Sequence, residues 1–168
     1  MEGRKNPRLS GYDYSHAGAY FVTVCVKERR HLLCSIENTT TNPVGRPLAA
    51  AVVRLSTWGE IVRQELIALE NRFSCLKVDK YVIMPNHVHA ILILESEAAE
   101  ASGRPTIPEI MRAWKSLSSR RCKLNGLNYP LWQTSFYDHI IRDEQDYLTR
   151  WKYIDDNPAK WAEDDYYI

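Results

Sequence analysis

The sequence predicts a single α+β domain, in which helices pack against an antiparallel sheet. Runs of β-branched and aromatic residues, typical of strands, alternate with stretches in which apolar residues recur at helical spacing. A turn signal near the middle of the chain joins two strand-like runs into a hairpin. The 168 residues are enough for one domain with a buried core, and 45% of them are hydrophobic.

The first third of the chain predicts a strand, a polar loop and a helix. Residues 20–26 (YFVTVCV) form the first strand, and after a basic turn residues 32–34 are a candidate short return strand. Residues 38–47 (NTTTNPVGRP) are polar and contain proline and glycine, which indicates a loop. From Arg54 to Leu69 the apolar residues share one helical stripe, so we expect an amphipathic helix there.

The central stretch from Leu76 to Leu94 predicts a β-hairpin. Its two apolar runs flank residues 84–86 (MPN), which form the turn. Side chains two apart in a strand point to the same face, so His87 and His89 project side by side from the second strand. Two neighbouring imidazoles on an exposed sheet face are candidate metal ligands, although His-x-His alone is weak evidence.

The last third of the chain predicts two helices separated by a short strand. A polar linker at residues 95–104 precedes a helix at 107–124, with Ile110, Trp114 and Leu117 on its buried stripe. Residues 132–141 contain the short strand, and a helix at 144–156 ends before Asn157-Pro158. The order strand, helix, hairpin, helix, strand, helix is typical of ferredoxin-like folds, and no internal repeat or second domain interrupts residues 1–168.

The last predicted helix carries a second pair of candidate site residues. Tyr153 and Asn157 are four positions apart, so they lie on one face, one turn apart. We expect Leu148, Trp151 and Ile154 to pack on the sheet, which would leave the phenol and the amide oxygen at its rim, near a metal site. Taken alone, Tyr153 could equally be a half-buried packing residue, and Asn157 a helix C-terminal cap.

Charge is unevenly distributed along the chain. Residues 104–125 contain six basic residues and one acid, whereas residues 143–165 contain eight acids and three basic residues. The basic helix is compatible with phosphate binding, and a solvated helix face is the alternative. The candidate nucleic-acid contacts are Arg112, Lys115, Arg120 and Arg121, together with Arg150 in the last helix.

Neither a membrane span nor a disulfide framework is predicted. No apolar stretch approaches the roughly 18 residues that a transmembrane helix needs, and the N-terminus is polar. The four cysteines are scattered without a Cys-x-x-Cys pair, which favours reduced, unreactive thiols. These observations predict a cytoplasmic protein.

Three strings in this sequence resemble the REP-associated tyrosine transposases, within the single-tyrosine HUH transposase superfamily. They are residues 81–89 (YVIMPNHVH), residues 132–142 with WQ and FYDHIIR, and residues 153–158 (YIDDNP). The resemblance extends from about Gly11 to Trp161, and three strings in this order are far more specific than His-x-His. The sequence departs from the family at residues 38–51 and after Trp161, which affects hairpin recognition more than cleavage chemistry.

The resemblance implies an RRM-like, ferredoxin-like fold that acts on single-stranded DNA near imperfect hairpins. His87 and His89 match the metal ligands of the family, Asn157 matches the polar residue that completes the metal site, and Tyr153 matches the nucleophile. The ligand set suits Mg²⁺ or Mn²⁺. The implied partner is single-stranded or hairpin DNA, with no membrane, and the protein would work as a monomer or a homodimer.

The chemistry implied is attack of the Tyr153 phenol on a phosphodiester, which gives a 5′-phosphotyrosine and a free 3′-hydroxyl. A second 3′-hydroxyl can then reverse the step and join a new strand. We expect Arg150 to ease ionisation of the phenol. Besides the cations, four aromatic residues are candidates for stacking on unpaired bases, although Trp114 fits a core position better: Trp114, Trp132, Phe136 and Tyr137.

Three alternatives stay open at this point. One is a metal-dependent hydrolase that uses water as nucleophile and a further ligand such as His139. Another is a domesticated protein that binds structured DNA or RNA without cutting it. The third is a rolling-circle initiator or relaxase, which uses the same chemistry but is disfavoured by the short chain.

Overall fold

The computed structural model describes residues 11–38, 51–96 and 103–167. Four strands form an antiparallel sheet in the order β4-β5-β1-β6. Their bounds are β1 Gly18–Cys25, β4 Leu76–Ile83, β5 His87–Leu94 and β6 Tyr137–Ile141. A separate two-stranded sheet pairs β2, Cys34–Asn38, with β3, Ala51–Leu55.

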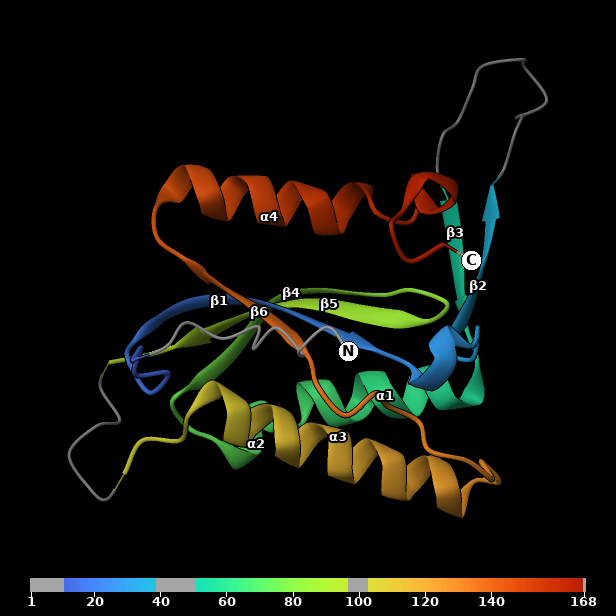
Figure 1. The fold of residues 1–168 in the computed structure, drawn as a ribbon, viewed down its shortest axis with the longest axis horizontal. Coiled ribbons are helices and arrows are strands. Elements are labelled where there is room, and N and C mark those ends of the chain that lie inside the picture. Colours follow the sequence, from blue (N-terminus) through green and yellow to red (C-terminus); the bar gives the residue numbers. More distant parts are fainter. Residues whose placement is uncertain (1–10, 39–50, 97–102, 168) are drawn as a thin grey trace, which may run out of the picture.

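Helices cover both faces of the four-stranded sheet (Figure 1). One face carries α1 (Thr57–Ile67), α2 (Leu69–Arg72) and α3 (Ile107–Leu124), and the other carries α4. The bounds of α4 are Glu144–Asp156, and two short 3₁₀ helices are η1, Lys27–Arg29, and η2, Trp161–Glu163. The predicted α+β architecture is confirmed. Across the described ranges, no helix combines the length and the apolar character that crossing a bilayer requires.

The second half of the chain follows the predicted boundaries closely, and the first half departs from them. The helices at 107–124 and 144–156 have the predicted bounds, and the hairpin turns at residues 84–86. Residues 54 and 55, expected to begin a helix, instead end β3, because α1 starts only after Ser56, whose hydroxyl accepts a hydrogen bond from the Gly59 backbone N–H. The return strand starts at residue 34 rather than 32, and most of the loop at 38–47 lies outside the described residues.

The large hydrophobic core lies between the sheet and the layer of α1 and α3. Alternate residues of β1 and β5 point into it, and α3 adds Trp114, whose indole N–H donates to the Val62 carbonyl at 3.2 Å. A capping box between Thr106 and Glu109 starts α3. The fully buried members from the strands and helices include Tyr20, Val24, Val88, Leu92, Leu66, Ile110 and Met111.

The opposite face of the sheet holds a much smaller apolar cluster beneath α4. Its buried members are Phe21, Ile91 and Ile154. The expectation that Leu148 packs on the sheet is wrong, since it is 52% exposed. Trp151 is 39% exposed but contacts the sheet at β4, where Lys80 Nζ lies 3.5 Å from the centroid of its ring. Helical geometry explains Leu148, which lies about 120° around the helix from Ile154 at roughly 100° per residue.

Candidate metal and nucleophile site

The histidine pair lies where the hairpin turn meets β5. His87 is the first residue of the strand, and the backbone N–H of Met84 donates to its carbonyl at 2.9 Å. Strand alternation directs His87 and His89 to the α4 face. Their cross-strand partners in β1 are Cys25 and Thr23, respectively. The two imidazole rings are 4.5 Å apart between centroids. The predicted juxtaposition of the two histidines is therefore present.

Hydrogen bonds hold one ring nitrogen of each histidine. His87 Nδ1 lies 2.8 Å from Asn86 Oδ1, which can only accept, so Nδ1 carries the proton and Nε2 keeps its lone pair. His89 Nδ1 lies 2.8 Å from Thr23 Oγ1. Neither buried Nε2 atom has a hydrogen-bond partner among the described residues. Both rings are thus oriented by neighbours in the manner of metal-binding histidines.

Both imidazoles stay neutral under ordinary conditions. Burial lowers the pKa of His87 to about 3, with a further contribution from the positive charge of Arg29. Burial also lowers the pKa of His89 well below its usual value, and proximity to His87 adds to this effect. The neutral form is the one that binds metal ions.

A third candidate ligand, Asp164, follows η2 near the end of the chain. One ligand atom from each of His87, His89 and Asp164 lies within 4.8 Å of the others. The Asp164 carboxylate is 4.0 Å from His87 Nε2, and its side chain is almost fully buried. Sequence reasoning missed this residue and counted it only within the acidic segment, because η2 and not a sequence spacing brings it to the histidines.

Asn157 joins the cluster from the C-terminal end of α4. Its side chain is buried, and its Nδ2 donates to Asp164 Oδ2 at 2.8 Å. Its Oδ1 is buried and has no hydrogen-bond donor among the described residues. Asn157 does occupy the C-cap position, yet its amide oxygen is left available for a cation.

Tyr153 stands at the open side of this cluster. Its ring lies edge-on to His89, with centroids 5.1 Å apart, and also contacts Phe21. The residue is 40% exposed and lines an open cavity. Burial and the negative charge of Asp164 raise the pKa of Tyr153, against the opposing effects of Asn157 and Arg150. Arg150 therefore acts in the expected direction, but it does not decide the balance.

The histidine face was expected to be exposed, and that expectation is wrong. The Tyr166 ring covers His87 at 4.5 Å between centroids, and Trp161 lies 6.0 Å from the same ring. The Asn86 side-chain N–H holds this cover by donating to the Tyr166 carbonyl at 2.8 Å. The segment after α4 thus closes over the histidines and brings Asp164 with it.

A cavity of about 200 Å³ opens beside Tyr153. Its acidic lining residues outnumber its basic ones: Asp156, Glu163, Asp164 and Asp165 against Lys160. Such a surface attracts cations and repels a phosphate group that arrives without one.

The other candidates near α4 are engaged in separate contacts. His139 Nε2 lies 2.7 Å from Asp146 Oδ2, and the three-residue metal group found among the described residues excludes it. The Tyr147 hydroxyl donates to Asp79 at 2.5 Å, away from the histidines. Arg150 is held by Asp146 at 3.3 Å and lies 5.5 Å from the Phe21 ring centroid.

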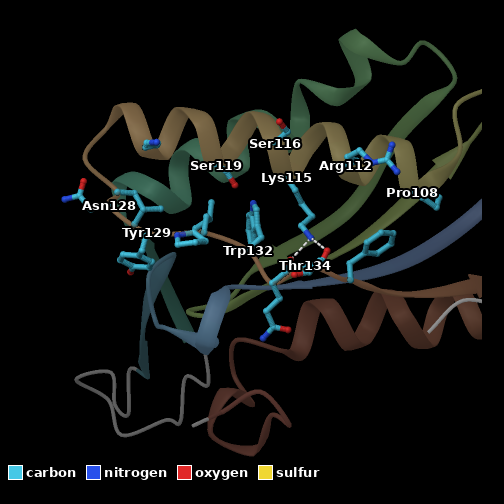
Figure 2. Close-up of a pocket in the computed structure, with 15 residues that line it drawn as sticks. Pro108, Arg112, Lys115, Ser116, Ser119, Asn128, Tyr129, Trp132 and Thr134 are labelled. Carbon is cyan, nitrogen blue, oxygen red and sulfur yellow. Dashed lines mark hydrogen bonds between the residues drawn. The ribbon is translucent and has the colours of Figure 1, made fainter. Parts of the chain in front are cut away.

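The candidate cations of α3 lie across the sheet from the histidines. Arg112 and Lys115 line a large groove on this side (Figure 2). Arg121 instead pairs with Glu65 of α1 at 2.7 Å, and Arg120 is exposed outside the groove lining. Of the candidate stacking residues, Tyr137 is exposed, whereas the three others are buried: Trp114, Trp132 and Phe136.

Comparison with known proteins relates the chain to transposases. No protein-family model matches it. An uncharacterized protein of Haemophilus influenzae is 29% identical over 180 residues, covering 98% of this chain and 93% of that one. The REP-associated tyrosine transposase of Escherichia coli K12 is 25% identical over 147 residues, covering 88% of this chain and 70% of that one.

A solved structure shows that the fold is shared as well. The REP-associated tyrosine transposase bound to a REP hairpin aligns with a TM-score of 0.61 at 23% identity, covering 95% of this chain and 76% of that one. By sequence and by fold, the chain is therefore a relative of the REP-associated tyrosine transposases, as its three strings predicted.

Proposed function

We propose that this protein is a metal-dependent endonuclease and strand transferase for single-stranded DNA, with Tyr153 as its nucleophile. One observation carries the proposal. The buried Nε2 atoms of His87 and His89 and the amide oxygen of Asn157 lack hydrogen-bond partners among the described residues, beside the partly exposed side chain of Tyr153. The kinship with a transposase supports a role in DNA processing.

The ligand atoms fit a divalent cation. Two neutral imidazoles, the Asp164 carboxylate and the Asn157 amide oxygen form a mixed nitrogen and oxygen set, which suits Mn²⁺ or Mg²⁺. When bound, the cation supplies positive charge that offsets both the phosphate and the Asp164 carboxylate. The acidic residues around Tyr153 give an independent reason to expect a strict cation requirement.

The chain's own residues would carry out the bond changes as follows. Tyr153 Oη attacks the phosphorus and loses its proton to water, and the bond from phosphorus to the 3′ oxygen breaks. The departing oxygen takes up a proton and becomes a free 3′-hydroxyl, while the phosphate stays on Tyr153 as a 5′-phosphotyrosine. Another 3′-hydroxyl can attack that phosphotyrosine, which releases the phenol and joins the strands.

We propose single-stranded or hairpin DNA as the partner. The similar solved structure is described as bound to a REP hairpin. Arg150 lies on α4 within the same layer as the nucleophile, where it would contact a phosphate near the cleaved bond. On the other side of the sheet the proposed contacts come from α3: Arg112, Lys115, Arg120 and Arg121, of which Arg121 must exchange its ion pair with Glu65.

Covalent capture tests the proposal. The protein is incubated with Mn²⁺ and a labelled single-stranded oligonucleotide that contains an imperfect hairpin, and is then denatured and run on a gel. We expect a slower-migrating adduct for the wild type and for Tyr137→Phe, and none for Tyr153→Phe, which keeps the ring and removes only the hydroxyl. An adduct with Tyr153→Phe would assign the nucleophile to another residue.

The same experiment separates the other functions. Cleaved DNA without an adduct would indicate a hydrolase that uses water. A DNA-binding protein that does not cut is the second candidate, and the cover of Trp161 and Tyr166 over the histidines favours it. That candidate predicts DNA binding with neither cleavage nor an adduct under any divalent cation.

A further inference from the structure

A groove of about 840 Å³ runs along α3 on the side of the sheet opposite to α4. Figure 2 shows it between α3 and the segment at residues 127–136, with Arg112 and Lys115 at one part and Tyr129 at another. Besides Ser116, the α3 residues that line it recur at three- to four-residue spacing along one face of the helix: Pro108, Arg112, Lys115, Ser119 and Lys123.

The chemistry of the groove suits an anionic ligand with flat rings. Three of its lining residues are cationic, namely Arg112, Lys115 and Lys123, and none of the residues that line it is acidic. Tyr129 also lines it, and the Arg30 guanidinium lies 4.5 Å from the centroid of the Tyr129 ring. Lysines and arginines beside aromatic side chains are the combination with which proteins hold unpaired nucleotides.

We propose that this groove holds an unpaired stretch of the same DNA strand that Tyr153 would cleave, and this inference rests on the proposed function. Phosphates lie on Arg112 and Lys123, and a base stacks against Tyr129. The groove is walled on two sides, by α3 and by the segment at 127–136, so it admits a single strand more readily than a base-paired duplex (Figure 2).

The groove has the length that a short strand needs. Residues 108 and 123 both line it, and at 1.5 Å per helical residue they are roughly 22 Å apart along α3. Lys115 fixes the opposite wall, because its Nζ donates to the carbonyls of Gln133 and Thr134 at 2.6 and 2.9 Å. The wall is therefore tied to the helix rather than free to close against it.

That wall continues the sheet toward the histidines. The Gln133 backbone N–H donates to the Cys25 carbonyl at 2.9 Å, and Cys25 pairs with His87 in the next strand. Gln133 thus lies two strand spacings from His87, or about 10 Å. A DNA strand that leaves the groove at Gln133 would pass around the edge of the β-sheet and reach the α4 face near the candidate metal site.

The first test measures binding without cleavage, in Tyr153→Phe protein with EDTA and a fluorescent single-stranded oligonucleotide. Arg112 and Lys123 are replaced together by alanine. The plot of the logarithm of the association constant against the logarithm of the salt concentration should then become less steep by about 1.4, and binding should weaken roughly 25-fold at 0.1 M salt. The matched control removes two exposed cations outside the groove, Arg72→Ala with Lys77→Ala. Equal effects in the two double variants would overturn the proposal.

The second test locates the DNA. Ultraviolet crosslinking of an iodouracil-substituted single strand, followed by peptide mapping, should place the crosslink on residues 127–136, with loss on Tyr129→Ala. Crosslinks confined to other segments, or equal competition by a blunt duplex or by RNA of the same sequence, would refute it. A wild-type protein that forms no Tyr153 adduct but passes both tests would refute the proposed catalysis and leave the groove assignment standing.

Discussion

The two faces of the four-stranded sheet differ in what they bury. Beneath α1 and α3 lies a large apolar core that includes fully buried Trp114 and Leu92. Beneath α4, three apolar residues are buried among the described residues, with a few partly buried ones packed around them, and two histidines, an asparagine and an aspartate lie beside this small cluster. Buried polar atoms without partners are costly to a fold, so the first face supplies stability and the second carries the candidate chemistry.

Neighbouring residues of β5 test this difference most strongly. Leu92 and Ile91 are both fully buried but point into opposite layers. Leu92→Ala should lower the free energy of unfolding by about 4 kcal/mol, because the dense core cannot collapse around the cavity. Ile91→Ala should cost about 2 kcal/mol, since the smaller layer can relax. Urea denaturation measures both, and equal costs would show that the faces are packed alike.

Cation binding should stabilise the α4 face specifically. At a Mn²⁺ concentration 100 times its dissociation constant, the free energy of unfolding should rise by about 2.7 kcal/mol. His89→Ala should remove this gain, and Asp164→Asn should reduce it, because both take away candidate ligand atoms. Asp165→Asn, a neighbouring exposed carboxylate, is the control. Thermal unfolding with and without Mn²⁺ gives the answer, and an unchanged wild-type midpoint would contradict the metal site.

When no metal is bound, acid should destabilise the protein because His87 is buried as a neutral imidazole on the α4 face. In the unfolded chain His87 takes up a proton near pH 6.5, whereas burial lowers its pKa in the folded protein to about 3. The unfolded state therefore binds more protons between these values, and stability falls as pH decreases. From pH 7 to 5 the loss should be about 2 kcal/mol for this group. Denaturation in EDTA should show a shallower pH dependence for His87→Gln.

The smallest effect is expected on the outer side of α4. Leu148 is 52% exposed and contributes little to either apolar cluster. Leu148→Ala should change the free energy of unfolding by no more than about 0.5 kcal/mol. Ile154→Ala, six residues further along the same helix and buried, provides the contrast with an expected loss of about 2 kcal/mol. A large cost at Leu148 would mean that this surface is covered in solution.

Much of this protein follows from local sequence. The capping signal at Thr106 and the apolar spacing of α3 place that helix without any tertiary information. Strand alternation is enough to put His87 and His89 on one face, and helical spacing aligns Tyr153 with Asn157. These features depend on periodicities of two and 3.6 residues, which are properties of the chain itself.

Tertiary structure alone decided the rest. The rotation of α4, which turns Ile154 inward and Leu148 outward, depends on which side chains the sheet presents to it. Asp164 reaches the histidines only because η2 folds the chain back over them, and the groove exists only because residues 127–136 pack beside α3. Contacts between residues far apart in sequence have no local period, and that is why the sequence by itself determined the histidine pair and the nucleophile candidate but not the site around them.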